Sequence, residues 1–232
     1  MFGQTSSLDK HLQYTCNEWT TSGYYKKVTQ TLLKSKIKSY IDIGACSGGV
    51  ADVLFDKIPS LNRSIMIDAN KENATFINQN NKNNPRIRVI NNAIFYGRSQ
   101  LKLGICPSNV GGASYKFNQN QFKIKATTIE NIIQENQNFI GDVDFIKIDI
   151  EGAEYNVLEN SSVLKSIPFI EIEFHRDPLY TKGAKRIFDF WKPFCQKHLP
   201  NHKLVHGGPN EQVTLGNGSK VYYSGSGLFA LQ

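Results

Sequence analysis

The sequence contains no apolar run long enough to cross a membrane. A transmembrane helix needs about 18 or more consecutive apolar residues, and no segment of the 232-residue chain approaches that length. The first residues, MFGQTSSLDKHLQY, also lack the basic stretch followed by an apolar stretch that is typical of a secretory signal. We therefore expect a cytoplasmic protein without a membrane span.

Cysteine is scarce and scattered along the chain. The sequence has four cysteines, and none of them forms a Cys-x-x-Cys pair. Disulfide frameworks and zinc sites both use closely spaced cysteines, so this spacing argues against either and is consistent with a reducing compartment.

Acidic residues are fewer than basic ones, and the basic residues form no run longer than two. Lys and Arg number 27 against 20 Asp and Glu, which gives a net charge of +7 and a pI near 9.1. Such a balance fits a nucleic-acid or acidic partner, but it also fits a solvated surface without one. The hydrophobic content of 40% excludes a disordered chain, and the length predicts a single domain over 1–232.

Short apolar strands alternate with helical patterns through most of the chain. The expected strands lie at 39–44, 64–69, 86–94, 143–150 and 167–175. The expected helices between and after them lie at 48–58, 70–82, 127–138, 152–165 and 182–198. This alternation predicts an α/β fold with a doubly wound, mostly parallel sheet and helices on both faces.

The two ends of the chain and one insert complete this expectation. Residues 1–38 read as an N-terminal helical segment in front of a core at 39–232. Residues 202–208 and 220–232 predict an antiparallel C-terminal hairpin, which brings the sheet to seven strands. An insert at about 98–125 reads as two strands around a Gly/Ser/Asn-rich loop.

The segment YIDIGACSGG (40–49) is a strand that runs into a glycine-rich turn. Gly44 and Gly48 are four residues apart, which is not the Gly-x-Gly-x-x-Gly spacing of a pyrophosphate cradle. Asp42 would repel a phosphate but could hold a cation. A ligand with a cationic amino-acid end and a nucleoside end therefore fits better than a dinucleotide, and a turn without any ligand is the alternative.

The next two strands end in residues suited to a nucleoside. Asp68 lies 24 residues after Gly44, where a carboxylate can accept hydrogen bonds from both ribose hydroxyls. The alternative is that Asp68 caps the following helix. Asn92 could bind an adenine edge and Ala93 would leave room for the ring, although the same residues could simply form a turn.

The fourth and fifth strands bring carboxylates and a histidine to the same edge of the sheet. Asp149 and Glu151 follow one strand, and Glu173 and His175 share a face at the end of the next. These groups are candidates for a general base. Helix capping by Glu151 and a structural His175 are the alternatives, and Lys147 reads as an ordinary strand-face residue.

The order of these segments resembles the FkbM-type family of class I S-adenosylmethionine-dependent methyltransferases. The resemblance covers about 39–175 and rests mainly on IKIDIEGAEYNVLEN, with YIDIGACSGG, IDAN, NNAI, TTIENII and PFIEIEFH in the expected order. Two departures are Cys46, where the family usually has Asn, and Asp68-Ala69, where it usually has Glu-Pro.

The resemblance implies a Rossmann-like fold, S-adenosyl-L-methionine as cofactor and a set of site residues. The cofactor-binding set would be Asp42, Gly44, Ala45 and Gly48 at the methionine end, Asp68 and Ala69 at the ribose, and Asn92 and Ala93 at the adenine. The catalytic set would be Asp149, Glu151, Glu173 and His175, with the choice of general base left open. The same four side chains could hold a divalent metal.

The resemblance implies methyl transfer, but it leaves the acceptor open. We expect O-methylation of a hydroxyl on a sugar, glycan or small metabolite. An RNA ribose 2′-hydroxyl is the alternative acceptor, and a non-catalytic S-adenosylmethionine-binding module is the second alternative. Tyr14, Trp19 or Tyr115 could shield a sulfonium, and 1–37, 104–120 and 176–219 would choose the acceptor.

Overall fold

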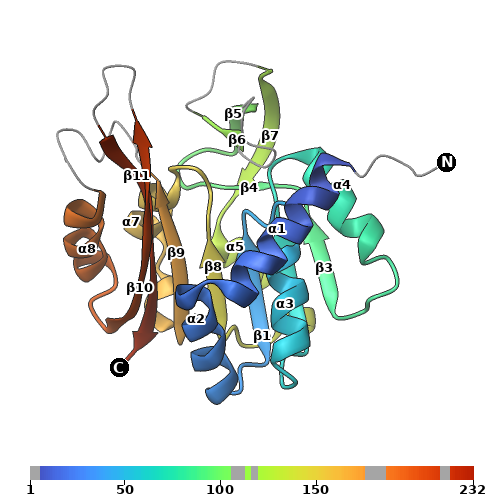
Figure 1. Cartoon of the computed structure of the whole chain (residues 1–232). Helices are drawn as coiled ribbons and strands as arrows, with labels where there is room; N and C mark the ends of the chain where they lie inside the picture. Colours follow the sequence, from blue (N-terminus) through green and yellow to red (C-terminus); the bar gives the residue numbers. More distant parts are fainter. Residues whose placement is uncertain (1–5, 106–112, 116–119, 176–186, 215–219) are drawn as a thin grey trace.

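A seven-stranded sheet forms the centre of the molecule, seen in a computed structural model that describes residues 6–105, 113–115, 120–175, 187–214 and 220–232 (Figure 1). Its strand order is β10-β11-β9-β8-β1-β2-β3. The strands are β1 (Ser39–Ile43), β2 (Arg63–Ile67), β3 (Ile87–Ile90), β8 (Phe145–Ile148), β9 (Phe169–His175), β10 (His202–Thr214) and β11 (Lys220–Leu231). Only the pairs that involve β11 are antiparallel. The expected doubly wound sheet with its C-terminal hairpin is thus confirmed.

Helices cover both faces of this sheet (Figure 1). One core cluster packs one face against α1 (Ser7–Thr21), α2 (Gly23–Lys34), α3 (Gly49–Lys57) and α4 (Lys71–Asn80). The other core cluster packs the opposite face against α5 (Ile129–Glu135), α6 (Gln137–Ile140), α7 (Glu154–Asn160), the 3-10 turn η1 (Val163–Ser166) and α8 (Ile187–His198). No helix in the described ranges combines the length and apolarity that crossing a membrane requires.

A smaller sheet lies above the central sheet in Figure 1. It has the order β4-β7-β5-β6 and consists of β4 (Ala93–Ile94), β5 (Gln100–Ile105), β6 (Ala113–Ser114) and β7 (Phe122–Thr127). The predicted single strand at 86–94 is therefore wrong. The chain leaves the central sheet after Ile90, because the Asn91 side chain donates to the carbonyls of Asp68 and Ala69 at 2.8 and 3.1 Å and turns the backbone towards β7.

Other expected helical segments are also divided in the structure. The expected N-terminal helical segment consists of two helices, α1 and α2, which are separated at the extended residue Ser22. The predicted helix 127–138 breaks at Asn136, and 152–165 becomes α7 followed by η1. In the described part, the helix expected at 182–198 begins at Ile187, and 182–186 lie outside the described residues.

Candidate functional site

The glycine-rich turn brings the ends of β1, β2 and β8 together. Gly44 has φ +86, and a Cβ on it would lie 1.7 Å from the carbonyl oxygen of Asp149. The backbone N–H of Gly44 donates to Ile67 at 2.9 Å, and that of Asp149 donates to Ile43 at 2.9 Å. The turn therefore requires glycine at this position, and it places Gly44 directly beside Asp149.

Asp68 is a buried carboxylate that ties this turn to the end of β2. Its two oxygens accept N–H groups from Cys46 and Asn70, each at 2.7 Å, and a further one from the Asn73 side chain at 3.3 Å. Burial raises the pKa of Asp68 to about 7 despite these bonds. The residue that caps α4 is Asn70, which accepts from Glu72, so the interpretation of Asp68 as the helix cap is wrong.

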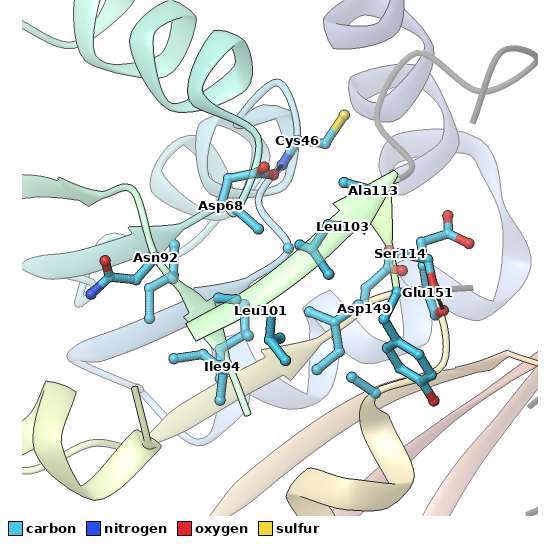
Figure 2. Close-up of a pocket in the computed structure, with 18 of the residues that line it drawn as sticks. Cys46, Asp68, Asn92, Ile94, Leu101, Leu103, Ala113, Ser114, Asp149 and Glu151 are labelled. Atoms are coloured by element: carbon cyan, nitrogen blue, oxygen red, sulfur yellow. Dashed lines mark hydrogen bonds between the residues drawn. The ribbon is translucent and has the colours of Figure 1, made fainter. Parts of the chain in front are cut away.

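One cavity joins the predicted nucleoside residues to the predicted acidic residues. In Figure 2, Asp68 and Asn92 lie towards one end, Asp149 and Glu151 lie towards the other, and Leu101 of β5 lies between them. The predicted site residues that line the cavity are Gly44, Asp68, Ala69, Asn92, Ala93, Asp149 and Glu151. The insert supplies one wall through Leu101, Leu103, Ala113, Ser114 and Tyr115.

A buried row of ionisable side chains lies behind the acidic end of the cavity. Asp42, Lys147 and Glu171 are direct neighbours on β1, β8 and β9. The Lys147 ammonium lies 2.9 Å from Asp149. Burial alone would lower the pKa of Lys147, but the neighbouring carboxylates, Asp149 first, outweigh burial and raise it. The same contact brings the pKa of Asp149 below its usual value, although burial by itself would raise it.

His175 lies at the end of β9 with both ring nitrogens facing carboxylates. Its Nδ1 is 2.9 Å from Glu154, and its Nε2 is 3.9, 3.9 and 3.8 Å from Asp149, Glu151 and Glu173. Burial would lower the pKa of His175, but the Glu154 carboxylate outweighs burial and raises it well above its usual value. These carboxylates therefore favour the protonated form of the ring.

Glu151 lines the cavity from a left-handed backbone conformation. Its φ is +54, a value that costs a non-glycine residue about 1–3 kcal/mol. The surrounding contacts hold it there: Ser114 donates to the Glu151 carbonyl at 2.8 Å, and Glu154 accepts the N–H groups of Ile150 and Gly152 at 3.0 and 3.1 Å. Strain of this kind is concentrated at functional sites.

Five of the predicted site residues do not line the cavity. These residues are Asp42, Ala45, Gly48, Glu173 and His175. Asp42 is fully buried beside Lys147 in the row of ionisable side chains. A Cβ on Gly48 would contact Ile77 and Met66, so this position faces the core.

The three aromatic candidates lie in different environments. Tyr115 lines the cavity. Trp19 is buried and stacks on Tyr25, and Tyr14 is 60% exposed. Among the described residues, no group of three or more His, Cys, Asp or Glu side chains has a geometry that could hold a metal ion.

Sequence reasoning missed three residues of the site. Lys147 and Glu154 belong to the segment IKIDIEGAEYNVLEN, so their position within it was the available signal. His11 lines the cavity from α1, and no sequence pattern marks it. The segments that we expected to choose the acceptor, 1–37, 104–120 and 176–219, lie partly outside the described residues.

Comparisons with known proteins agree with this architecture. A family model described as the methyltransferase FkbM domain matches residues 42–198. The structure of a methyltransferase FkbM from Methylobacillus flagellatus KT has a TM-score of 0.50 and 17% identity to this chain. That match covers 84% of this chain and 44% of the other, so this chain spans less than half of that protein's length.

Two further solved structures are similar at lower scores. An O-methyltransferase from Bacillus cereus in complex with SAH has a TM-score of 0.45 and 12% identity, and the match covers 99% of this chain and 93% of the other. A fibrillarin from Aeropyrum pernix has a TM-score of 0.46 and 10% identity, with 88% and 74% covered. No curated protein matches the chain.

Proposed function

Because the chain belongs to the FkbM methyltransferase family, we propose that it transfers a methyl group from S-adenosyl-L-methionine to a hydroxyl of a sugar, glycan or other small metabolite. One observation carries this proposal. A single cavity contains Asp68 and Asn92, which suit a nucleoside, and the carboxylates of Asp149 and Glu151, which suit activation of a hydroxyl. A donor and an acceptor could therefore meet in the same space.

The residues at the nucleoside end fit such a donor. Each Asp68 oxygen is fixed by backbone N–H groups and keeps acceptor capacity for a ribose hydroxyl. Ala69 and Ala93 are small, and Leu101 and Leu103 offer apolar surface for a flat ring. When bound, S-adenosylmethionine supplies an electrophilic methyl group on a cationic sulfur.

Glu151 is the general base in this proposal. Lys147 lowers the pKa of Asp149, which weakens it as a base, and the raised pKa of His175 favours its protonated form. Glu173 does not line the cavity, whereas Glu151 does. As the bond from the acceptor oxygen to the methyl carbon forms and the carbon–sulfur bond breaks, the hydroxyl proton moves to the Glu151 carboxylate.

A methyl-transfer screen tests the proposal. Radiolabelled S-adenosylmethionine is incubated with glycans, nucleotide sugars and RNA, and the labelled product identifies the acceptor class. Glu151→Gln should lose about 100-fold or more in turnover while it retains affinity for S-adenosylhomocysteine. Glu135→Gln, on the exposed surface of α5, is the matched control and should behave as the wild type. Equal turnover in Glu151→Gln would contradict the assignment of the base.

A second candidate acceptor is an RNA ribose 2′-hydroxyl, favoured by the outer face of the β5–β7 hairpin. Lys102 lies directly opposite Lys123, and Lys125 is on the same exposed face. Like charges at opposed positions are unfavourable, and no ion pair within the described residues neutralises them. A bound polyanion would neutralise them.

RNA binding across a salt series distinguishes this candidate. Affinity that depends on phosphate contacts falls steeply as salt rises. The double variant Lys102→Gln, Lys123→Gln should reduce both the affinity and the salt slope if RNA is the acceptor. Affinity and a salt slope that stay unchanged in this variant would remove the support that the hairpin gives to the RNA candidate.

A further inference from the structure

We propose that His11 of helix α1 binds the carboxylate of the amino-acid end of S-adenosylmethionine and closes the cavity beside the glycine-rich turn. This inference rests on the proposed function and extends the site beyond the region matched by the family model, which begins at residue 42. His11 lies 31 residues before that boundary.

The contacts of His11 fix its ring against the turn. Its Nδ1 lies 3.1 Å from the Ser47 hydroxyl and 3.3 Å from the Thr15 hydroxyl. The ring also lies against Cys46, whose sulfur is 3.5 Å from Nδ1 and 3.7 Å from Nε2. Either hydroxyl can donate to Nδ1, which places the hydrogen of the neutral ring on Nε2. A ligand acceptor would compete there with the weakly accepting Cys46 sulfur.

The position of α1 relative to this turn is also fixed. A Cβ on Gly49 would lie 2.9 Å from the Thr15 Cβ and 3.2 Å from the Leu12 carbonyl oxygen. The Cys16 thiol donates to the Gly49 carbonyl at 3.6 Å. In Figure 1, α1 lies beside α3. Helix α1 is therefore packed tightly against the turn, and it places the His11 side chain in the lining of the cavity.

The charges around the cavity indicate which part of the ligand His11 would contact. The amino-acid end of the donor carries one ammonium and one carboxylate. Asp68, Asp149 and Glu151 line the cavity and can attract the ammonium, but within the described chain no Lys or Arg lines it. Burial lowers the pKa of His11, so its neutral ring offers an N–H donor, and the ligand carboxylate is the group that accepts such a hydrogen bond.

The affinities for two ligands distinguish carboxylate binding by His11 from a general effect of the substitution on the cavity. S-adenosylhomocysteine carries the amino-acid end, whereas 5′-methylthioadenosine shares the nucleoside and lacks the amino acid. Isothermal titration measures both ligands on the full chain. His11→Ala should weaken the affinity for S-adenosylhomocysteine about 10-fold or more, which is the usual effect of losing a hydrogen bond to a charged group. It should change the affinity for methylthioadenosine less than about twofold.

Two further variants make the result interpretable. His206→Ala is the matched control, because His206 on β10 also bonds a threonine, Thr31, at 3.0 Å, yet does not line the cavity. It should leave both affinities unchanged. His11→Gln keeps a side-chain donor and should recover part of the lost affinity.

The outcomes separate this inference from the proposed function. Equal losses for both ligands in His11→Ala, or no loss for either, would overturn the role of His11 while the proposed function stands. Failure of the wild type to bind either ligand would instead overturn the proposed function, and the role of His11 with it.

Discussion

The affinity for S-adenosylhomocysteine should depend on pH through Asp68. This carboxylate is 6% exposed, and burial raises its pKa to about 7 in the ligand-free protein. Ribose hydroxyls donate hydrogen bonds to an ionised carboxylate better than to a protonated one. Ligand binding should therefore lower this pKa and release a proton.

The size of the effect follows from that pKa of about 7. At pH 6 about one tenth of Asp68 would be ionised, and at pH 8 about nine tenths would be, so the affinity should be about 10-fold weaker at pH 6. In free energy this is about 1.4 kcal/mol. Affinity should rise between pH 6 and 7 and level off above pH 8.

Isothermal titration at pH 6, 7 and 8 in one constant ionic strength measures this dependence. Asp68→Asn cannot ionise, so its affinity should be weak and nearly independent of pH. The exposed Asp56 provides a surface control, because Asp56→Asn should keep the wild-type profile. A wild-type affinity that is equal at pH 6 and 8, or a 10-fold dependence that survives in Asp68→Asn, would refute the reasoning.

Three further predictions concern the framework of the site. Gly44→Ala should destabilise the fold by about 3 kcal/mol or more in urea unfolding, because its Cβ would lie 1.7 Å from the Asp149 carbonyl oxygen. Lys147→Met should cost about 3–5 kcal/mol in the same assay, because it leaves the buried carboxylate partners without their ammonium. Glu154→Gln should lower the pKa of His175 in an NMR titration. In the wild type, the stability contributed by the raised His175 pKa is full below about pH 6.5 and is lost as the pH rises through that pKa.

Local patterns in the sequence were sufficient to predict the central sheet. Apolar strands such as SYIDI and FIKI are buried on both faces, so they read as continuous apolar runs bounded by turns. The glycine at position 44 was also informative. A side chain there would collide with the carbonyl oxygen of Asp149, which follows the neighbouring strand β8. The prediction of where β3 ends was wrong, because the direction of the chain there depends on the Asn91 side chain and on the distant strand β7.

The site was less predictable because its electrostatics depend on contacts between distant segments. The sequence indicated His175 as a candidate base, but Glu154 on another element raises its pKa and favours its protonated form. Lys147 read as a strand-face residue, yet the strand register places it between Asp42 and Glu171. Such roles follow from register and packing, which no single segment encodes.

The buried carboxylates also change the meaning of the net charge. Glu171 is fully buried, accepts a hydrogen bond from Tyr24 at 3.2 Å, and has a pKa raised to about 8 by burial, so it is largely protonated at neutral pH. Lys147 then mainly balances Asp149.

The formal net charge of +7 counts Glu171 as ionised, so it does not describe the surface, where Lys102 and Lys123 face solvent on the insert. Net charge carries information about a partner only through such a local arrangement. For this reason the paired lysines, and not the total, distinguish an RNA acceptor from a neutral sugar. Replacing these two lysines tests only the contribution of the surface charge to RNA binding, because neither side chain lines the cavity.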